Sequence, residues 1–159
     1  MATGRALLTY SIFEGILVGQ AGGKSFHIFA LSGGGGGSKS TKAGWVAGGV
    51  VNNPYMTGLK ERDTKSRHRH GGPLPVGRYT IARPEANHEG KGRWAALVPD
   101  PWNVMMNRAG FAIHGRGQHG SDGCIVPTNP ADFQGLMDAL EADGGGVLHV
   151  LSSMGGDFA

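Results

Sequence analysis

The sequence Phe111-Ala-Ile-His-Gly-Arg-Gly-Gln-His-Gly-Ser-Asp-Gly-Cys-Ile125 predicts two short strands joined by a glycine-rich return. The first apolar run ends at His114, and the second begins directly after Cys124, the only cysteine of the chain. Glycines at positions 115, 117, 120 and 123 let the loop double back, so we expect the two side chains to meet. A thiol becomes a strong nucleophile as the thiolate, and a nearby imidazole can take its proton. The stretch therefore indicates a cysteine nucleophile with His114 as its base.

Three further groups in this stretch are candidates for catalysis. The carbonyl of Gly115 is placed to fix the tautomer of the preceding imidazole, as the third member of a triad does. The backbone amides of Gly123 and Cys124 are the expected oxyanion donors, because a glycine before the nucleophile lets the backbone approach the substrate closely. Ser121 either takes part in catalysis by hydrogen-bonding the thiolate or serves as an ordinary turn residue.

Other interpretations of the same residues stay open. A lone cysteine is more often a small buried hydrophobe than a nucleophile. His119 is a rival base, although its place within the loop favours solvent exposure or contact with substrate. Asp122 either orients His119, and so belongs to the substrate-binding region, or caps the turn. A metal site is disfavoured because no zinc-ligand spacing is present, and we expect neither metal nor cofactor. The histidines considered as ligands with Cys124 are His68, His70, His88, His114 and His119.

The composition is typical of one loop-rich β domain that spans residues 1–159. The chain has 30 glycines and only 17% charged residues, which is unusual for a helical bundle. Its net charge of +3 comes without a dense basic stripe or interleaved aromatics, so we expect no nucleic-acid partner. No apolar run approaches the roughly 20 residues that cross a bilayer, and the N-terminus does not resemble a secretory signal. We therefore expect no transmembrane segment and synthesis in the cytoplasm.

Hydrophobic periodicity predicts mostly strands and a single helix. Residues 7–13, 16–18 and 25–31 read as a β-meander, and residues 33–44 as a mobile glycine-rich surface loop. A helix is expected at residues 130–142, because Asn129 can cap it, Pro130 suits its first position, and apolar residues recur at i, i+3, i+4 and i+7. The other expected strands are a proline-started segment at 73–81 and segments at 94–98, 104–106, 111–114 and 147–151.

Two loops and one aromatic residue are expected near the site. Residues 59–70, with His68 and His70, are expected to form a solvated basic loop. This loop and residues 33–37 are the lid candidates, since both are long and weakly anchored. Tyr79, which follows the proline-glycine motif, either lines a substrate groove or packs in the core or at a sheet edge, as aromatic residues on strands commonly do.

The pair His114-Gly115, followed by Ser121-Asp-Gly-Cys124, resembles the active-site signature of the YkuD-type L,D-transpeptidase catalytic domain. In that signature a histidine precedes a Ser/Thr-x-Gly-Cys segment. Ser32-Gly33, Asn52-Asn-Pro54 and the run from Gly72 to Tyr79 are further landmarks, and together they resemble a diverged branch of type VI secretion effectors that attack peptidoglycan. The housekeeping enzymes usually have histidine before the Gly-Cys pair and arginine shortly after it. This chain has Asp122 and Val126 there, which favours the effector branch.

The resemblance implies a small, mostly β sandwich with one packed helix, and an acyl-transfer reaction. Cys124 would attack the carbonyl of the L-centre of diaminopimelate in a tetrapeptide stem, His114 would carry the protons, and the terminal D-alanine would leave. Water would then complete an L,D-carboxypeptidase reaction. A free D-amino acid would give exchange, and the amine of a second stem would give a 3,3 cross-link.

The resemblance also implies an antibacterial toxin with particular partners. A cognate immunity protein and components of the type VI secretion system are expected, with secretion that needs no signal peptide and action in the periplasm of a target cell. A papain-like cysteine peptidase is the alternative enzyme, although such enzymes place the cysteine before the histidine. The non-enzymatic alternative is a secretion-associated binding module in which the thiol of Cys124 is part of the core.

Overall fold

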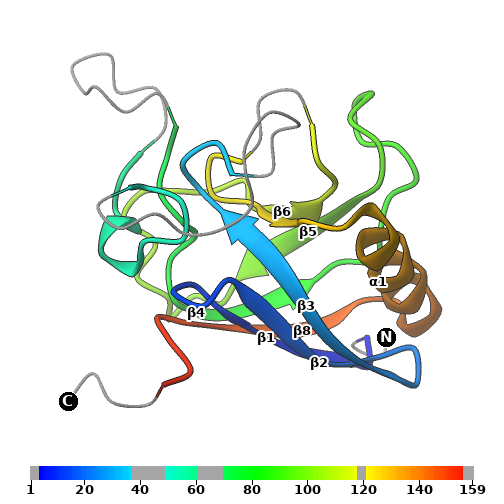
Figure 1. The fold of residues 1–159 in the computed structure, drawn as a ribbon. Helices are drawn as coiled ribbons and strands as arrows, with labels where there is room; N and C mark the ends of the chain where they lie inside the picture. The colour runs from blue at the N-terminus through cyan, green and yellow to red at the C-terminus, as the bar shows by residue number, and fades with distance from the viewer. Residues whose placement is uncertain (1–3, 37–48, 61–69, 118–120, 156–159) are drawn as a thin grey trace.

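The structure is a computed structural model that describes residues 4–36, 49–60, 70–117 and 121–155. In this part of the chain eight strands close a barrel in the order β1-β2-β3-β7-β6-β5-β4-β8, and the helix α1 packs beside β1, β2, β3 and β7 (Figure 1). The expected mostly β fold with one packed helix is confirmed, and its strands form one continuous barrel. The elements are β1 Ala6–Ser11, β2 Ile16–Ala21, β3 Lys24–Ser32, the 3-10 helix η1 Pro54–Met56, β4 Gly77–Ile81, β5 Trp94–Pro99, β6 Ala112–His114, β7 Ile125–Pro127, α1 Pro130–Asp143 and β8 Gly146–Leu151.

The predicted N-terminal meander is confirmed, and the last strand of the chain extends it. β1, β2 and β3 pair antiparallel in sequence order, whereas β8 pairs parallel to β1. Leu8 lies opposite Leu148 and Tyr10 opposite Val150, and all four side chains are buried. Side chains on a strand alternate between its two faces, so this register lines the barrel interior with apolar residues from both ends of the chain.

The Asn52-Asn53-Pro54 turn hydrogen-bonds to buried polar groups of strands β1 and β3. The buried Tyr10 hydroxyl lies 3.0 Å from both Asn52 Oδ1 and the Ala30 carbonyl oxygen, and Asn52 Oδ1 accepts a hydrogen bond from the Ser32 amide at 2.7 Å. Asn53 caps η1 by accepting the Tyr55 amide at 3.0 Å. The predicted turn therefore satisfies polar groups that burial would otherwise leave without partners.

Helix α1 follows the local signals of its sequence and ends one residue later than predicted. Asn129 Oδ1 accepts the amides of Ala131 at 2.8 Å and Asp132 at 3.2 Å. Gly144 adopts the left-handed conformation that ends the helix. The helix buries its apolar side against the barrel through Phe133, Leu136, Met137, Ala139 and Leu140.

Two predictions about the loops are wrong. Residues 104–106 are not a strand, because Met106 and Asn107 have φ values of 54° and 59° and the Arg108 amide closes a turn onto the Met105 carbonyl at 3.0 Å. Residues 33–36 are an anchored turn, since the Gly35 amide donates to the Ser121 carbonyl at 2.9 Å and Gly36 forms a β-bridge with Ser121. The rest of the predicted loop at 37–44 lies outside the described residues.

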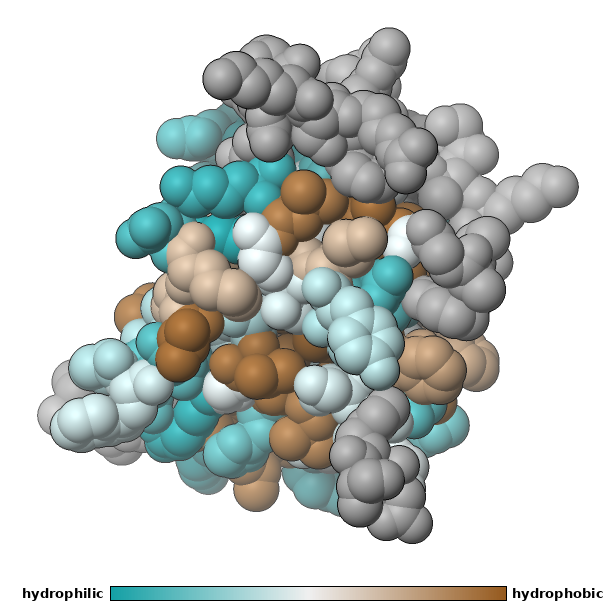
Figure 2. All heavy atoms as spheres, turned by 90° about the vertical axis from the view of Figure 1, so that its left-hand side faces the viewer, coloured by the Kyte–Doolittle hydropathy of each residue, from teal (hydrophilic) through white to brown (hydrophobic). Residues whose placement is uncertain are grey.

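The outer surface mixes apolar and polar side chains. Figure 2 faces the side of the barrel that carries η1, where hydrophobic side chains are interspersed with hydrophilic ones. The most exposed large apolar residues of the described chain are Tyr55, Trp102 and Val104. Within the described residues, no helix has the length and apolar character needed to cross a membrane.

Candidate active site

His114 ends strand β6, where a hydrogen bond to the backbone determines which ring nitrogen carries the proton. Its Nδ1 lies 2.8 Å from the Gly115 carbonyl oxygen, which can only accept, so Nδ1 carries the proton and donates it. The other nitrogen, Nε2, is left with its lone pair for taking a proton. Burial lowers the pKa of His114 below its ordinary value, the Gly115 hydrogen bond opposes this, and the charge of Lys91 lowers the pKa further. The imidazole is therefore neutral at neutral pH, as a general base must be.

Cys124 directly precedes β7, the strand that pairs with β6. The two strands run parallel with Ile113 opposite Ile125, and both isoleucines are buried in the core. If the alternation of side chains along a strand continues to the residue before β7, His114 and Cys124 lie on the face opposite these isoleucines. The meeting of the two side chains stays a prediction. The Cys124 sulfur is partly exposed and lies 3.8 Å from the Gly110 carbonyl oxygen.

Ser121 holds the backbone of the cysteine loop. Its buried Oγ accepts the amides of Gly33 at 3.2 Å and Gly123 at 3.0 Å, and its hydroxyl donates to the Cys124 carbonyl. A fully buried hydroxyl with these partners does not contact substrate, so the structure contradicts a direct catalytic role. It also contradicts Gly123 as an oxyanion donor, because its amide is already donated to Ser121. The oxyanion role of the Cys124 amide stays a prediction.

The carbonyl side of the same loop is fixed by Ser32. Its Oγ donates to the Gly123 carbonyl at 2.8 Å and accepts the Leu74 amide at 3.1 Å. The Ser32-Gly33 and Gly72-to-Tyr79 landmarks thus meet at the loop before Cys124.

Gly123 is required by both its backbone conformation and its surroundings. Its φ is +137°, and a Cβ there would lie 2.4 Å from Phe111 Cε1 and 2.8 Å from Arg108 Nη2. No side chain fits without displacing a buried ring and a buried guanidinium. Gly123 therefore allows close packing of the loop before Cys124.

Arg108 is a structural residue of the site that sequence reasoning missed. Only 8% of it is exposed, and its guanidinium donates to the carbonyls of Thr57 at 2.5 Å, Pro73 at 2.7 Å, Gly72 at 2.8 Å and Asp122 at 2.8 Å. It also lies over the Phe111 ring, 5.1 Å from the centroid. One buried cation thus joins three loops, and nothing in its local sequence signals this.

Tyr79 differs from its predicted role, and Asp122 has partners that were not predicted. Asp122 Oδ1 lies 2.8 Å from His70 Nδ1 and accepts the Gly71 amide at 3.3 Å, so it joins the residues before Cys124 to His70 and Gly71. Its role in orienting His119 or capping the turn stays a prediction. His70 is half-buried and paired with Asp122. Tyr79 is fully buried and donates to the Pro75 carbonyl at 2.6 Å, so it does not line a groove. Burial raises its pKa. His119 lies outside the described residues.

Trp94 is the second neighbour of the site that sequence reasoning missed. It lies opposite His114 in the β5–β6 register, and the two rings stack with centroids 5.0 Å apart and planes 5° from parallel. The strand at 94–98 was predictable from its apolar residues. Its register against His114 was not.

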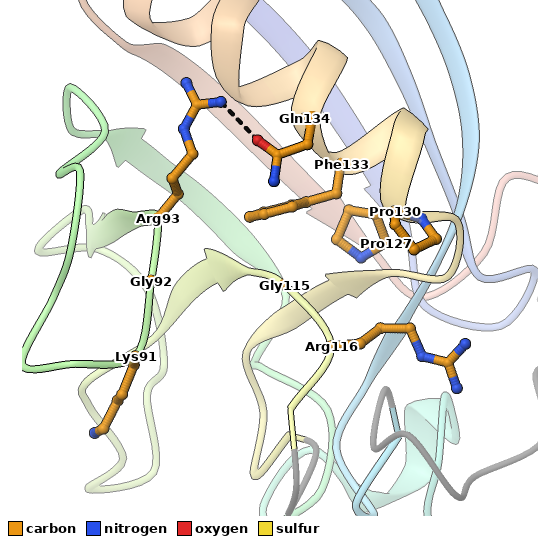
Figure 3. Close-up of a pocket in the computed structure, with 9 residues that line it drawn as sticks. All are labelled: Lys91, Gly92, Arg93, Gly115, Arg116, Pro127, Pro130, Phe133 and Gln134. Carbon is orange, nitrogen blue, oxygen red and sulfur yellow. Dashed lines mark hydrogen bonds between the residues drawn. The ribbon is translucent and has the colours of Figure 1, made fainter.

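An open cavity of about 430 Å³ lies beside Gly115 (Figure 3). Its volume falls within the range of small-molecule sites. Arg93 points toward Gln134 of α1, with Nη1 and Oε1 2.8 Å apart. The other lining residues are Lys91, Gly92, Arg116, Pro127, Pro130 and Phe133. The described residues contain no group of three or more histidine, cysteine, aspartate or glutamate side chains arranged to hold a metal ion.

Comparisons with known proteins place this site in a family context. The family model of the Tlde1 domain matches residues 50–149. An L,D-transpeptidase structure from Xylanimonas cellulosilytica is 16% identical, with a TM-score of 0.46 over 94% of this chain and 62% of that one. An L,D-transpeptidase from Mycobacterium smegmatis is 13% identical, with a TM-score of 0.47 over 93% of this chain and 59% of that one. The chain thus spans about three fifths of each. A comparison with curated proteins found no match.

Proposed function

The chain belongs to the Tlde1 domain family, and on this premise we propose that it is a cysteine acyltransferase that acts on the tetrapeptide stems of peptidoglycan. The observation that carries the proposal is the state of His114. Its Nδ1–H is held by the Gly115 carbonyl, its pKa is lowered by burial, and it projects from the strand next to the one that begins after Cys124. These features support the pairing of a thiol nucleophile with an imidazole base.

The first half of the reaction makes a thioester. His114 Nε2 takes the thiol proton, and Cys124 Sγ attacks the carbonyl carbon of the L-centre of diaminopimelate. The tetrahedral intermediate then collapses, the bond from carbon to the nitrogen of the terminal D-alanine breaks, and the imidazolium returns its proton to that nitrogen. D-Alanine leaves, and the tripeptide stem stays attached to Sγ.

The second half of the reaction transfers the acyl group. His114 removes a proton from the incoming nucleophile, which attacks the thioester and releases the thiol. Water gives a tripeptide stem, a D-amino acid gives an exchanged stem, and the side-chain amine of a second stem gives a 3,3 cross-link. We propose hydrolysis and exchange as the toxic reactions, because both remove the tetrapeptide donors of a growing wall.

Mass spectrometry of muropeptides tests the proposed reaction. Purified protein incubated with tetrapeptide muropeptides should yield tripeptides, and added D-methionine should divert part of the product into the exchanged stem. Cys124→Ala and His114→Ala should abolish or strongly reduce both. His149→Ala is the matched control, because His149 is an exposed histidine on β8 and should leave the products unchanged. Identical spectra for wild type and Cys124→Ala would refute the proposal, and cleavage of unrelated proteins with intact muropeptides would favour the papain-like alternative.

We propose further that the protein is a type VI secretion effector that acts in the target periplasm and is neutralised by an immunity protein. Expression of the chain with a periplasmic signal should therefore slow bacterial growth, whereas cytoplasmic expression should be tolerated. Cys124→Ala should remove the toxicity at equal protein level. Equal growth with periplasmic and cytoplasmic wild-type protein would contradict this part of the proposal.

A further inference from the structure

The indole of Trp94 stacks with two imidazole rings. The His114 ring lies 5.0 Å away between centroids, with planes 5° from parallel. The His88 ring lies 4.4 Å away, with planes 17° from parallel. The flat face of the indole therefore lies against His114 and parallel to the plane of its imidazole.

The backbone around Trp94 holds this stack in place. Trp94 is paired with His114 across β5 and β6, and its other neighbour is Glu85, with which it exchanges two backbone hydrogen bonds of 2.8 and 3.1 Å. The Glu85 carboxylate in turn lies 3.0 Å from His88 Nδ1, which orients the outer ring. A strand pairing on one side and a β-bridge on the other therefore fix the backbone of Trp94.

We propose that Trp94 is a positioning residue for His114. Its indole holds the imidazole in the plane that keeps Nδ1 on the Gly115 carbonyl, and its π-face stabilises the imidazolium formed when Cys124 gives up its proton. A cation over a tryptophan face is attracted by the ring quadrupole. The inference rests on the proposed function, in that it takes Cys124 as the nucleophile and His114 as its base.

Charged groups of the 85–91 segment lie close to the stack. Lys91 Nζ lies 5.5 Å from the Trp94 ring centroid and 3.8 Å from Glu89, which also lies 3.7 Å from His88 Nε2. The Glu85 carboxylate contacts His88. The charge of Lys91 also acts on His114 and lowers its pKa.

A double-mutant cycle on the alkylation of Cys124 tests this role. Iodoacetamide reacts with the thiolate, so its rate at pH 7 reports how well His114 holds the proton. Trp94→Leu keeps an apolar side chain but removes the π-face, and we expect the rate to fall about tenfold. Trp94→Phe retains a ring and should stay within about threefold of wild type. In a His114→Ala background Trp94→Leu should have no further effect, because its action passes through the imidazole.

The outcomes separate a positioning role from a merely structural one. An equal loss from Trp94→Leu with and without His114, or an equal loss for the Leu and Phe variants, would overturn the inference. If Trp94→Leu lacks the wild-type circular dichroism spectrum, Trp94→Met, which is flexible and fills the same space without a ring, takes its place in the cycle. With muropeptides, Trp94→Leu should lower kcat and leave KM unchanged. Failure of the wild type to process muropeptides would refute the proposed function. The alkylation cycle would still show whether Trp94 acts on Cys124 through His114.

Discussion

Gly123 shows how a single residue shapes the loop before Cys124. Its left-handed backbone and its contacts with Phe111 and Arg108 leave no room for a side chain, and the Ser121 and Ser32 hydroxyls hold its two peptide groups. The sequence motif alone suggested an oxyanion donor at this position. The contacts explain the glycine by packing, since its amide is already satisfied.

Gly123→Ala should therefore lower both the stability of the protein and the reactivity of the Cys124 thiol. We expect a loss of about 2–3 kcal/mol in the free energy of unfolding, from backbone strain and overpacking, and much slower alkylation of Cys124. Urea denaturation and iodoacetamide kinetics measure the two effects. As a control, Gly117→Ala should be nearly neutral, because a Cβ there meets no atom of the described residues within 4 Å. Wild-type behaviour of Gly123→Ala would contradict the described loop.

His114 should make folding sensitive to acid. Its pKa in the folded protein lies below the ordinary histidine value of about 6.5, so the unfolded chain binds a proton first as the pH falls. Stability from the neutral imidazole is complete above about pH 6.5 and is lost as the pH drops toward the folded pKa, with a slope of at most about 1.4 kcal/mol per pH unit.

Urea denaturation of wild type and His114→Gln at pH 7, 6 and 5 measures this contribution. The wild type should lose more stability than the variant over this interval, whereas His149→Gln should follow the wild type. Parallel losses for wild type and His114→Gln would show that burial of His114 does not depress its pKa.

At the scale of elements, the site is assembled from three loops and two short strands. β6 supplies His114, and Cys124 directly precedes β7, while Arg108 joins the loop before Cys124 to the segments around Thr57 and Gly72. A buried guanidinium with four carbonyl partners is costly to remove, because each carbonyl loses a charge-assisted hydrogen bond.

Arg108→Met should lower the free energy of unfolding by about 3 kcal/mol or more and slow the alkylation of Cys124, since the loop loses its anchor. Arg78→Met is the matched control. Arg78 makes a surface ion pair with Asp100, and its loss should cost about 1 kcal/mol or less. Chemical denaturation of the two variants side by side gives the comparison. Equal stability losses would mean that Arg108 is not the anchor described here.

The predictable elements were those with local signals. Helix α1 has its cap, proline and apolar stripe within a few residues of one another, and the His-to-Cys return is ten residues long, so both could be predicted from sequence. The contacts of Arg108, Trp94 and His70 depend on strand register and on where separate loops meet. Residues 104–106 looked like a strand because they are apolar, but the positive φ values that follow turn the chain so that Arg108 can enter the core.

At the scale of the whole molecule, the barrel brings an N-terminal strand to the candidate site. Strands β1 to β3 lie outside the residues that the family model matches, yet β3 pairs with β7 and supplies Ser32 to the loop before Cys124. β1 and β8 close the barrel on the opposite side. The matched range alone therefore lacks three strands of the structure that holds Cys124.

The central claim is that Cys124 accepts the acyl group of a peptidoglycan stem. Rapid acid quenching of the protein after mixing with tetrapeptide muropeptides, followed by intact-mass and peptide mass spectrometry, tests this most directly. We predict a species heavier by one tripeptide-stem acyl group, with the added mass on the peptide that contains Cys124, and neither the adduct nor product with Cys124→Ala. Product formation by Cys124→Ala, or an adduct at another residue, would contradict the account.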